Sequence, residues 1–186
     1  MHAPMRGAGY TLPELVITVS ILAIAASFAT QSWSSFVSSS RHRAILENYH
    51  TLFAFARWTA ASKRTIVTAC PLSPARRCVD DWERPISVFI DENKDGTPDN
   101  DVVLRRVRVD LTSFTLHSRT AGRGYFRFNE KGMSEGSMGS LVLCPDNTSQ
   151  GTMTYMPVNI AGRFRVEYDH DHDGKIRLPW GAKISC

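Results

Sequence analysis

The chain has 186 residues, 42% of them hydrophobic, and a formal charge of +4. This length predicts one domain with at most an appendage, and the apolar content excludes a wholly disordered chain. Arginine outnumbers lysine 17 to 5, and residues 41–77 carry seven basic side chains against one acid. Because guanidinium groups bind phosphate and carboxylate in a bidentate way, this bias favours an anionic partner, with a solvated basic surface as the alternative.

The N-terminal region contains a long uncharged segment with one acid at its start. No charged residue occurs from Leu15 to Ser40, and Leu15 to Ala29 is almost wholly apolar. A helix needs about 20 apolar residues to cross a bilayer. An ordinary signal peptide and a simple membrane anchor both leave Glu14 unexplained, because an acid within such a segment costs about 2.5–3.5 kcal/mol.

Cleavage between Gly9 and Tyr10 offers a third hypothesis for this region. Glu14 then becomes the fifth residue, one helical turn from a new amino-terminal cation. In an assembly, its carboxylate would pair with the N-terminus of a neighbouring subunit and set the stagger between adjacent helices.

The stretch formed by Gly9, Tyr10 and "TLPELVITVSILAIAASFA" resembles the class III signal of type IV pilins and pseudopilins. The resemblance implies cleavage by a prepilin peptidase after Gly9 and N-methylation of Tyr10. It divides the chain into a leader (residues 1–9), a transmembrane and filament-core helix (10–37) and a periplasmic or extracellular head (38–186).

The helix is expected to continue into the head. Ile45, Tyr49, Leu52 and Ala56 recur at helical spacing and form an apolar stripe suited to packing on a sheet. We therefore predict one helix from Tyr10 to about Ser62.

After Lys63 the hydrophobic pattern changes to a period of two, which is typical of strands separated by turn residues. A helix followed only by strands predicts an α+β fold with a head rich in antiparallel strands. The expected strands are "RTIVTAC", "PISVFID", "VVLRRVRVDL", "SFTLHSR", "GYFRFNE", "GSLVLCP", "MTYMPVNI", "GRFRVEYD" and "KIRLPW".

Three stretches of the head resemble the GspH/FimT pseudopilin family. They are "CPLSPARRCVDDWERPISVFIDENKDGTPDNDVVLRRVRV", "YFRFNEKGMSEGSMGSLVLC" and the final "GRFRV". The N-terminal signal is shared by all pilins, whereas these head motifs select the family. The resemblance implies a pilin fold in which the helix packs on the sheet of the head.

The four cysteines are Cys70, Cys78, Cys144 and Cys186, and none forms a C-x-x-C pair of the kind that zinc sites use. The export that the resemblance implies makes two disulfides possible. We expect one between Cys70 and Cys78 and one between Cys144 and Cys186, and a 70–144 linkage remains open.

Two loops carry acids at alternate positions before a glycine, as calcium loops do: Asp91, Asn93 and Asp95, then Asp169, Asp171 and Asp173. Both lack the acid expected at the twelfth place. Because such residues also favour tight turns, we predict neither a metal site nor a cofactor.

The segment "GMSEG" matches the hydrolase pattern around a nucleophilic serine, here Ser134. That pattern needs a strand before it and a helix after it. A polar segment precedes it and a strand is expected to follow, so we predict a turn, no catalytic residue and no enzymatic activity.

Arg163 and Arg165 in "GRFR" are two residues apart, so on a strand they share one face while Phe164 takes the other. Lys175 and Arg177 form a second such basic pair. The alternative is a set of edge charges that prevent sheet pairing. In FimT-type pilins, a GRxR motif contacts DNA, and the resemblance assigns phosphate contacts without base readout to Arg163 and Arg165, with Lys175 and Arg177 as further candidates for DNA binding.

The resemblance thus implies a minor type IV pilin that takes part in pilus assembly or priming and binds double-stranded DNA for uptake in natural transformation. Its other partners are major and minor pilins, the prepilin peptidase and the inner membrane. It would be single-pass, with its head in the periplasm, and would enter an extracellular pilus or its tip. The alternative is a minor pseudopilin of a type II secretion system that binds other pseudopilins.

Overall fold

The computed structural model describes residues 11–136, 138–147 and 151–186, without the side chains of residues 28–32, 34 and 35. The chain divides into two compact units, residues 1–37 and 38–186. One helix, α1 (Leu12–Lys63), supplies all the described residues of the first unit except Thr11, and it continues into the second unit. The helix ends one residue after the predicted end.

The first unit presents apolar side chains to its surroundings. Seven large aliphatic residues between positions 15 and 24 are each more than half exposed: Leu15, Val16, Ile17, Val19, Ile21, Leu22 and Ile24. Over the described part of the chain, no helix is both long and apolar enough to cross a membrane.

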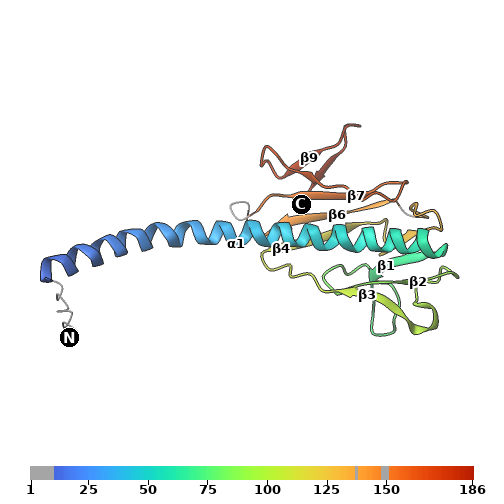
Figure 1. Cartoon of the computed structure of the whole chain (residues 1–186). Helices are drawn as coiled ribbons and strands as arrows, with labels where there is room; N and C mark the ends of the chain where they lie inside the picture. Colours follow the sequence, from blue (N-terminus) through green and yellow to red (C-terminus); the bar gives the residue numbers. More distant parts are fainter. Residues whose placement is uncertain (1–10, 137, 148–150) are drawn as a thin grey trace, which may run out of the picture. The chain divides into compact units, whose positions relative to one another are not determined.

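The second unit contains all the described strands, and every pair of hydrogen-bonded neighbours is antiparallel. Two sheets have four strands each and a third is a hairpin (Figure 1). The first sheet has the order β3 (Val103–Val107), β2 (Ile86–Ile90), β1 (Val67–Pro71), β5 (Phe126–Phe128). The second has the order β4 (Phe114–Arg119), β6 (Gly139–Pro145), β7 (Thr154–Val158), β8 (Glu167–Tyr168), and the hairpin joins β9 (Lys175–Arg177) to β10 (Lys183–Ser185). The prediction of an α+β fold with antiparallel sheets is confirmed.

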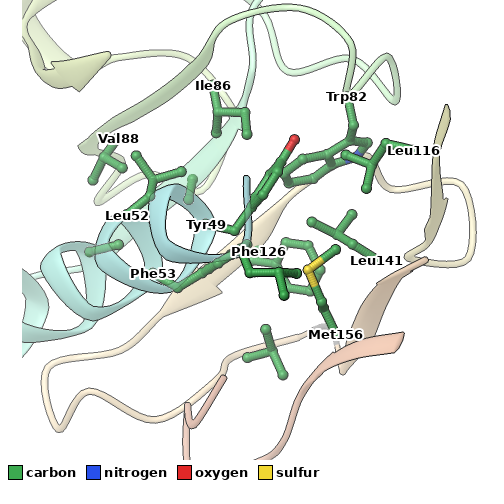
Figure 2. Close-up of a cluster of buried hydrophobic side chains, with 14 of the residues drawn as sticks. Tyr49, Leu52, Phe53, Trp82, Ile86, Val88, Leu116, Phe126, Leu141 and Met156 are labelled. Atoms are coloured by element: carbon green, nitrogen blue, oxygen red, sulfur yellow. The ribbon is translucent and has the colours of Figure 1, made fainter. Parts of the chain in front are cut away.

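The apolar stripe of α1 forms the centre of the core, as its spacing predicts. Tyr49 and Phe53 are buried on the helix and contact side chains from both four-stranded sheets (Figure 2). The Phe53 ring meets the Phe126 ring of β5 edge to face, with centroids 4.9 Å apart. Such aromatic pairs add about 0.5–1.5 kcal/mol beyond their buried area, so this contact helps to fix the helix on the sheets.

Both expected disulfides are present in the structure. Cys70 bonds to Cys78 across a separation of 8 residues, and Cys144 bonds to Cys186 across 42. The second bond joins the last residue of the chain, after the β9–β10 hairpin, to the buried strand β6. In the chain-entropy model the longer loop contributes more stability, about 4 kcal/mol against about 2.5 kcal/mol for the shorter one.

Candidate functional site

The predicted assembly residues lie at the start of the chain. Gly9 and Tyr10 fall outside the described residues. Glu14 lies in the first turn of α1 and is exposed, directly before the exposed aliphatic residues of the first unit. A carboxylate is favourable at this position, because the N-terminus of a helix carries a partial positive charge.

The GRFR segment follows a tight turn after β7 and is not a regular strand. The Gly162 amide donates to the Asn159 carbonyl oxygen at 2.8 Å, and the Asn159 amide donates to the Arg163 carbonyl oxygen at 3.1 Å. Only Phe164 forms a bridge with β7, opposite Val158. The strand begins three residues later than Phe164, at Glu167.

The three GRFR side chains after the glycine separate as their alternation predicts. Phe164 stacks on Phe53 with centroids 5.2 Å apart, so it is anchored in the core. Arg163 and Arg165 are both exposed. Within the described residues, neither guanidinium is ion-paired with a carboxylate.

The turn at Gly162 packs directly on the turn at Gly132. A Cβ atom at Gly162 would lie 2.2 Å from the Gly132 carbonyl oxygen. The same oxygen accepts a hydrogen bond from Arg57 Nε at 3.1 Å. The exposed Arg57 of α1 therefore lies beside the GRFR turn, and Lys131 precedes Gly132 in the chain. Sequence reasoning missed these two cations, because they are 106 and 32 residues before Arg163.

The second predicted basic pair differs from the first. Lys175 is exposed on β9. Arg177 donates to Asp171 at 2.7 Å and to Asp173 at 2.5 Å. The hydrogen bonds to Asp171 and then Asp173 raise the pKa of Arg177 above its usual value. Its charge is thus already compensated, whereas no described carboxylate compensates those of Arg163 and Arg165.

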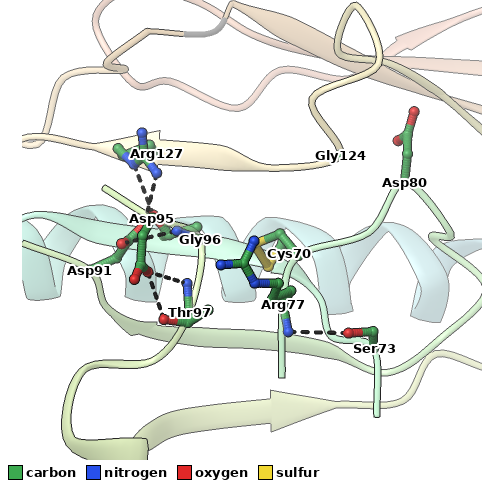
Figure 3. The surroundings of a disulfide bond; sticks show 12 residues. Cys70, Ser73, Arg77, Asp80, Asp91, Asp95, Gly96, Thr97, Gly124 and Arg127 are labelled. Atoms are coloured by element: carbon green, nitrogen blue, oxygen red, sulfur yellow. Dashed lines mark hydrogen bonds and ion pairs between the residues drawn. A yellow bond between two sulfur atoms is a disulfide. The ribbon is translucent and has the colours of Figure 1, made fainter. Parts of the chain in front are cut away.

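The first Asp-rich loop (residues 91–96) is closed by a buried arginine. Asp91 is fully buried, and its Oδ2 accepts from Arg127 Nη2 at 2.8 Å and from Thr68 Oγ1 at 2.7 Å (Figure 3). Arg127 also donates to the Lys94 carbonyl oxygen at 3.0 Å. The protein itself therefore supplies the positive charge that a metal would bring to this loop.

The second Asp-rich loop (residues 169–174) connects β8 to β9. Asp169 is 3% exposed, while Asp171 and Asp173 are exposed. Each of the three offers one carboxylate oxygen within 4.8 Å of the others. Asp169 and Asp171 line a groove of about 470 Å³ between β8 and β9, together with Tyr168 and Lys175. Asp173 does not line this groove.

The GMSEG segment forms a turn, as predicted. Its Ser134 amide donates to the Ile160 carbonyl oxygen at 2.9 Å, and Ser134 bridges Phe128. The next described element is strand β6, so the helix that a nucleophile elbow requires does not follow.

The helix, the antiparallel sheets and the exposed apolar first unit together define a pilin-like α+β protein. Residues 46–162 match the family described as type II transport protein GspH. This match covers more than half of the chain, and the chain belongs to that family of minor pilins and pseudopilins.

Solved structures agree with this fold. A crystal structure of the type IV minor pilin FimU from Pseudomonas aeruginosa has a TM-score of 0.57 and 17% identity, and the match covers 71% of this chain and 92% of that one. A second crystal form of FimU has a TM-score of 0.53 at 17% identity, covering 67% and 91%. No curated protein matches the chain.

Proposed function

We propose that this chain is a minor subunit of a type IV pilus and that its N-terminal helix joins it to other pilins. The observation that carries this proposal is the row of exposed aliphatic side chains between Leu15 and Ile24. Such a surface is unfavourable in water and requires an apolar partner. Helices of other pilins would cover it in the filament, and the inner membrane would hold the uncharged segment before assembly.

Glu14 sets the position of the subunit in this proposal. Cleavage after Gly9 leaves the Tyr10 amine, which becomes N-methylated, and a neighbouring subunit's amine pairs with the Glu14 carboxylate. This pairing offsets the cost of burying the acid among apolar helices.

Incorporation into pili tests the assembly proposal. Glu14→Ala should reduce the amount of the chain in sheared pili, while mass spectrometry still finds cleavage after Gly9. Glu47→Ala, which removes an exposed acid further along α1, should incorporate normally. Equal incorporation of both variants would contradict the role of Glu14.

We further propose that the head binds double-stranded DNA through Arg163 and Arg165, for uptake in natural transformation. The support is their exposure without a carboxylate partner among the described residues, on a segment that Phe164 anchors to the core. Charges at fixed spacing suit phosphates, and phosphate contacts carry no sequence information. Lys175 is a further candidate for such contacts. Arg177 contributes less, because Asp171 and Asp173 compensate its charge.

A role in type II secretion is the second candidate, since the matched family is described as type II transport protein GspH. In that case the head binds other pseudopilins and not DNA. The full chain is co-expressed with pilins or with pseudopilins from the same organism. The set of proteins that co-purifies with it distinguishes a role in the pilus from a role in secretion. Capture by pseudopilins alone would favour secretion.

A further inference from the structure

The two Asp-rich loops share the same backbone turn. In the second loop the Gly174 amide donates to Asp169 Oδ2 at 2.8 Å. In the first loop the Gly96 amide donates to Asp91 Oδ1 at 3.3 Å. Both hydrogen bonds run from the sixth residue of the loop to the first, so each loop curls around its first carboxylate.

The fifth residue also has the same role in both loops. The Asp173 carboxylate accepts from the Lys175 amide at 2.9 Å, and the Asp95 carboxylate accepts from the Thr97 amide at 2.8 Å. Since the backbones correspond, the two loops differ chiefly in what neutralises the buried aspartate.

In the first loop the Arg127 guanidinium bonds to Asp91, whereas no cation in the described part of the chain forms an ion pair with Asp169. Among the described residues, no donor bonds to Asp169 Oδ1, although this atom is buried. A buried polar atom without a partner is rare in native proteins and indicates a missing water or ion. Arg177 bonds only to the outer acids, Asp171 and Asp173.

The three carboxylates are spaced as ligands of one cation would be. Their oxygens lie within 4.8 Å of one another. Two oxygens on opposite sides of a calcium ion are about 4.8 Å apart, because each Ca–O distance is about 2.4 Å. The residues occupy the first, third and fifth places of the loop, with Gly174 at the sixth, as in known calcium loops.

We propose that the second Asp-rich loop binds Ca²⁺ through the carboxylates of Asp169, Asp171 and Asp173. Asp169 is the buried ligand, and its amide is fixed to the Met153 carbonyl oxygen at 3.0 Å. Water and backbone carbonyls complete the 6–8 oxygens that calcium requires. The ion takes over the charge compensation that Arg177 gives in its absence, and it ties β8 to the β9–β10 hairpin.

The affinity should be modest. The twelfth place of the loop is Trp180, so the bidentate acid of stronger sites is missing. We expect a Kd of about 10⁻⁴–10⁻³ M, the range of extracellular calcium modules.

Isothermal titration calorimetry with CaCl₂ tests this site, using the full chain in detergent after treatment with a chelator. The wild type should bind one ion per chain, and calcium should raise its Tm, since a ligand that binds only the folded state stabilises it. Asp169→Asn should weaken binding at least tenfold. Absence of saturable binding in the wild type up to about 10 mM, ten times the weak end of the range, would overturn the proposal.

Matched variants in the two loops exclude a general effect of lost charge. Asp173→Asn and Asp95→Asn each remove one exposed acid from the fifth place of a loop. Only Asp173→Asn should weaken binding, while Arg177→Gln should strengthen it by removing a competing cation. Circular dichroism establishes that each variant is folded. Equal affinity of folded Asp173→Asn and Asp95→Asn would also overturn the proposal.

Discussion

Gly162 and Gly132 are in backbone contact, since a Cβ atom on Gly162 would lie 2.2 Å from the Gly132 carbonyl oxygen. Real Cβ atoms essentially never come within 3.0 Å of such an atom. Gly162 also has φ = +70°, a conformation that other residues rarely adopt. Packing therefore requires the glycine of GRFR, and this contact fixes the position of the backbone that leads into Arg163.

Gly162→Ala should lower the free energy of unfolding by more than about 1–3 kcal/mol. That range is the usual cost of a strained backbone residue, and the clash with Gly132 adds to it. Chemical denaturation of the full chain in detergent measures this loss. Gly122→Ala is the matched control, because Gly122 has φ = +75° but no atom within 4 Å of its Cβ position. The same loss in both variants would show that the contact with Gly132 is unimportant.

Arg127→Gln should be strongly destabilising. Asp91 is fully buried and the Arg127 side chain is 7% exposed, so removal of the cation leaves a buried carboxylate uncompensated. We expect a loss of about 3–5 kcal/mol in the free energy of unfolding.

Arg84→Gln is the control for the Arg127 variant. It breaks an ion pair with Asp81 in which both side chains are 47% exposed, and such pairs contribute about 0–1 kcal/mol. If denaturation curves show equal losses for the two variants, the buried pair does not stabilise the head.

His42 should make the stability depend on pH. Burial lowers the pKa of His42 below 6.5, and its ring bonds to Thr154 Oγ1 at 2.8 Å and stacks on Phe114. The unfolded chain therefore takes up a proton at higher pH than the folded one. The stabilisation is present above the unfolded pKa and is lost as the pH falls through the folded pKa.

Thermal unfolding of the wild type and His42→Gln at about pH 8 and about pH 5 measures this effect. The Tm advantage of the wild type should be smaller at the lower pH. An equal or larger advantage at the lower pH would contradict the assigned direction of the pKa shift.

Periodicity predicted the main elements because each depends on local pattern. The helical stripe through Tyr49 and Leu52 packs on the sheets as expected, and each of the nine expected strand segments contains an observed strand. The strand expected from Gly162 to Asp169 was wrong in extent, because the turn at Gly162 leaves only Glu167–Tyr168 regular. The short strand β10 was missed, since three residues with one buried side chain give no periodic signal.

The site was less predictable, because its contacts join distant parts of the chain. Arg127 lies 36 residues from Asp91, and no local sequence pattern predicts that the two form an ion pair. Likewise, Lys175 and Arg177 look equivalent in the sequence. Of the two, Arg177 forms the ion pairs with Asp171 and Asp173 of the second Asp-rich loop. Alternation did separate Arg163 and Arg165 from Phe164, and in the structure both arginines are exposed while Phe164 stacks on Phe53.

A salt-dependent DNA titration of the full chain, in detergent and with intact disulfides, tests the central claim most directly. The wild type and the Arg163→Gln, Arg165→Gln double variant are compared on duplexes of unrelated sequence. We predict binding without sequence preference and a log–log salt slope that is smaller by about two in the variant, at about 0.9 per phosphate contact. Equal slopes for the two proteins, or no wild-type binding at low salt, would contradict DNA recognition by the GRFR segment.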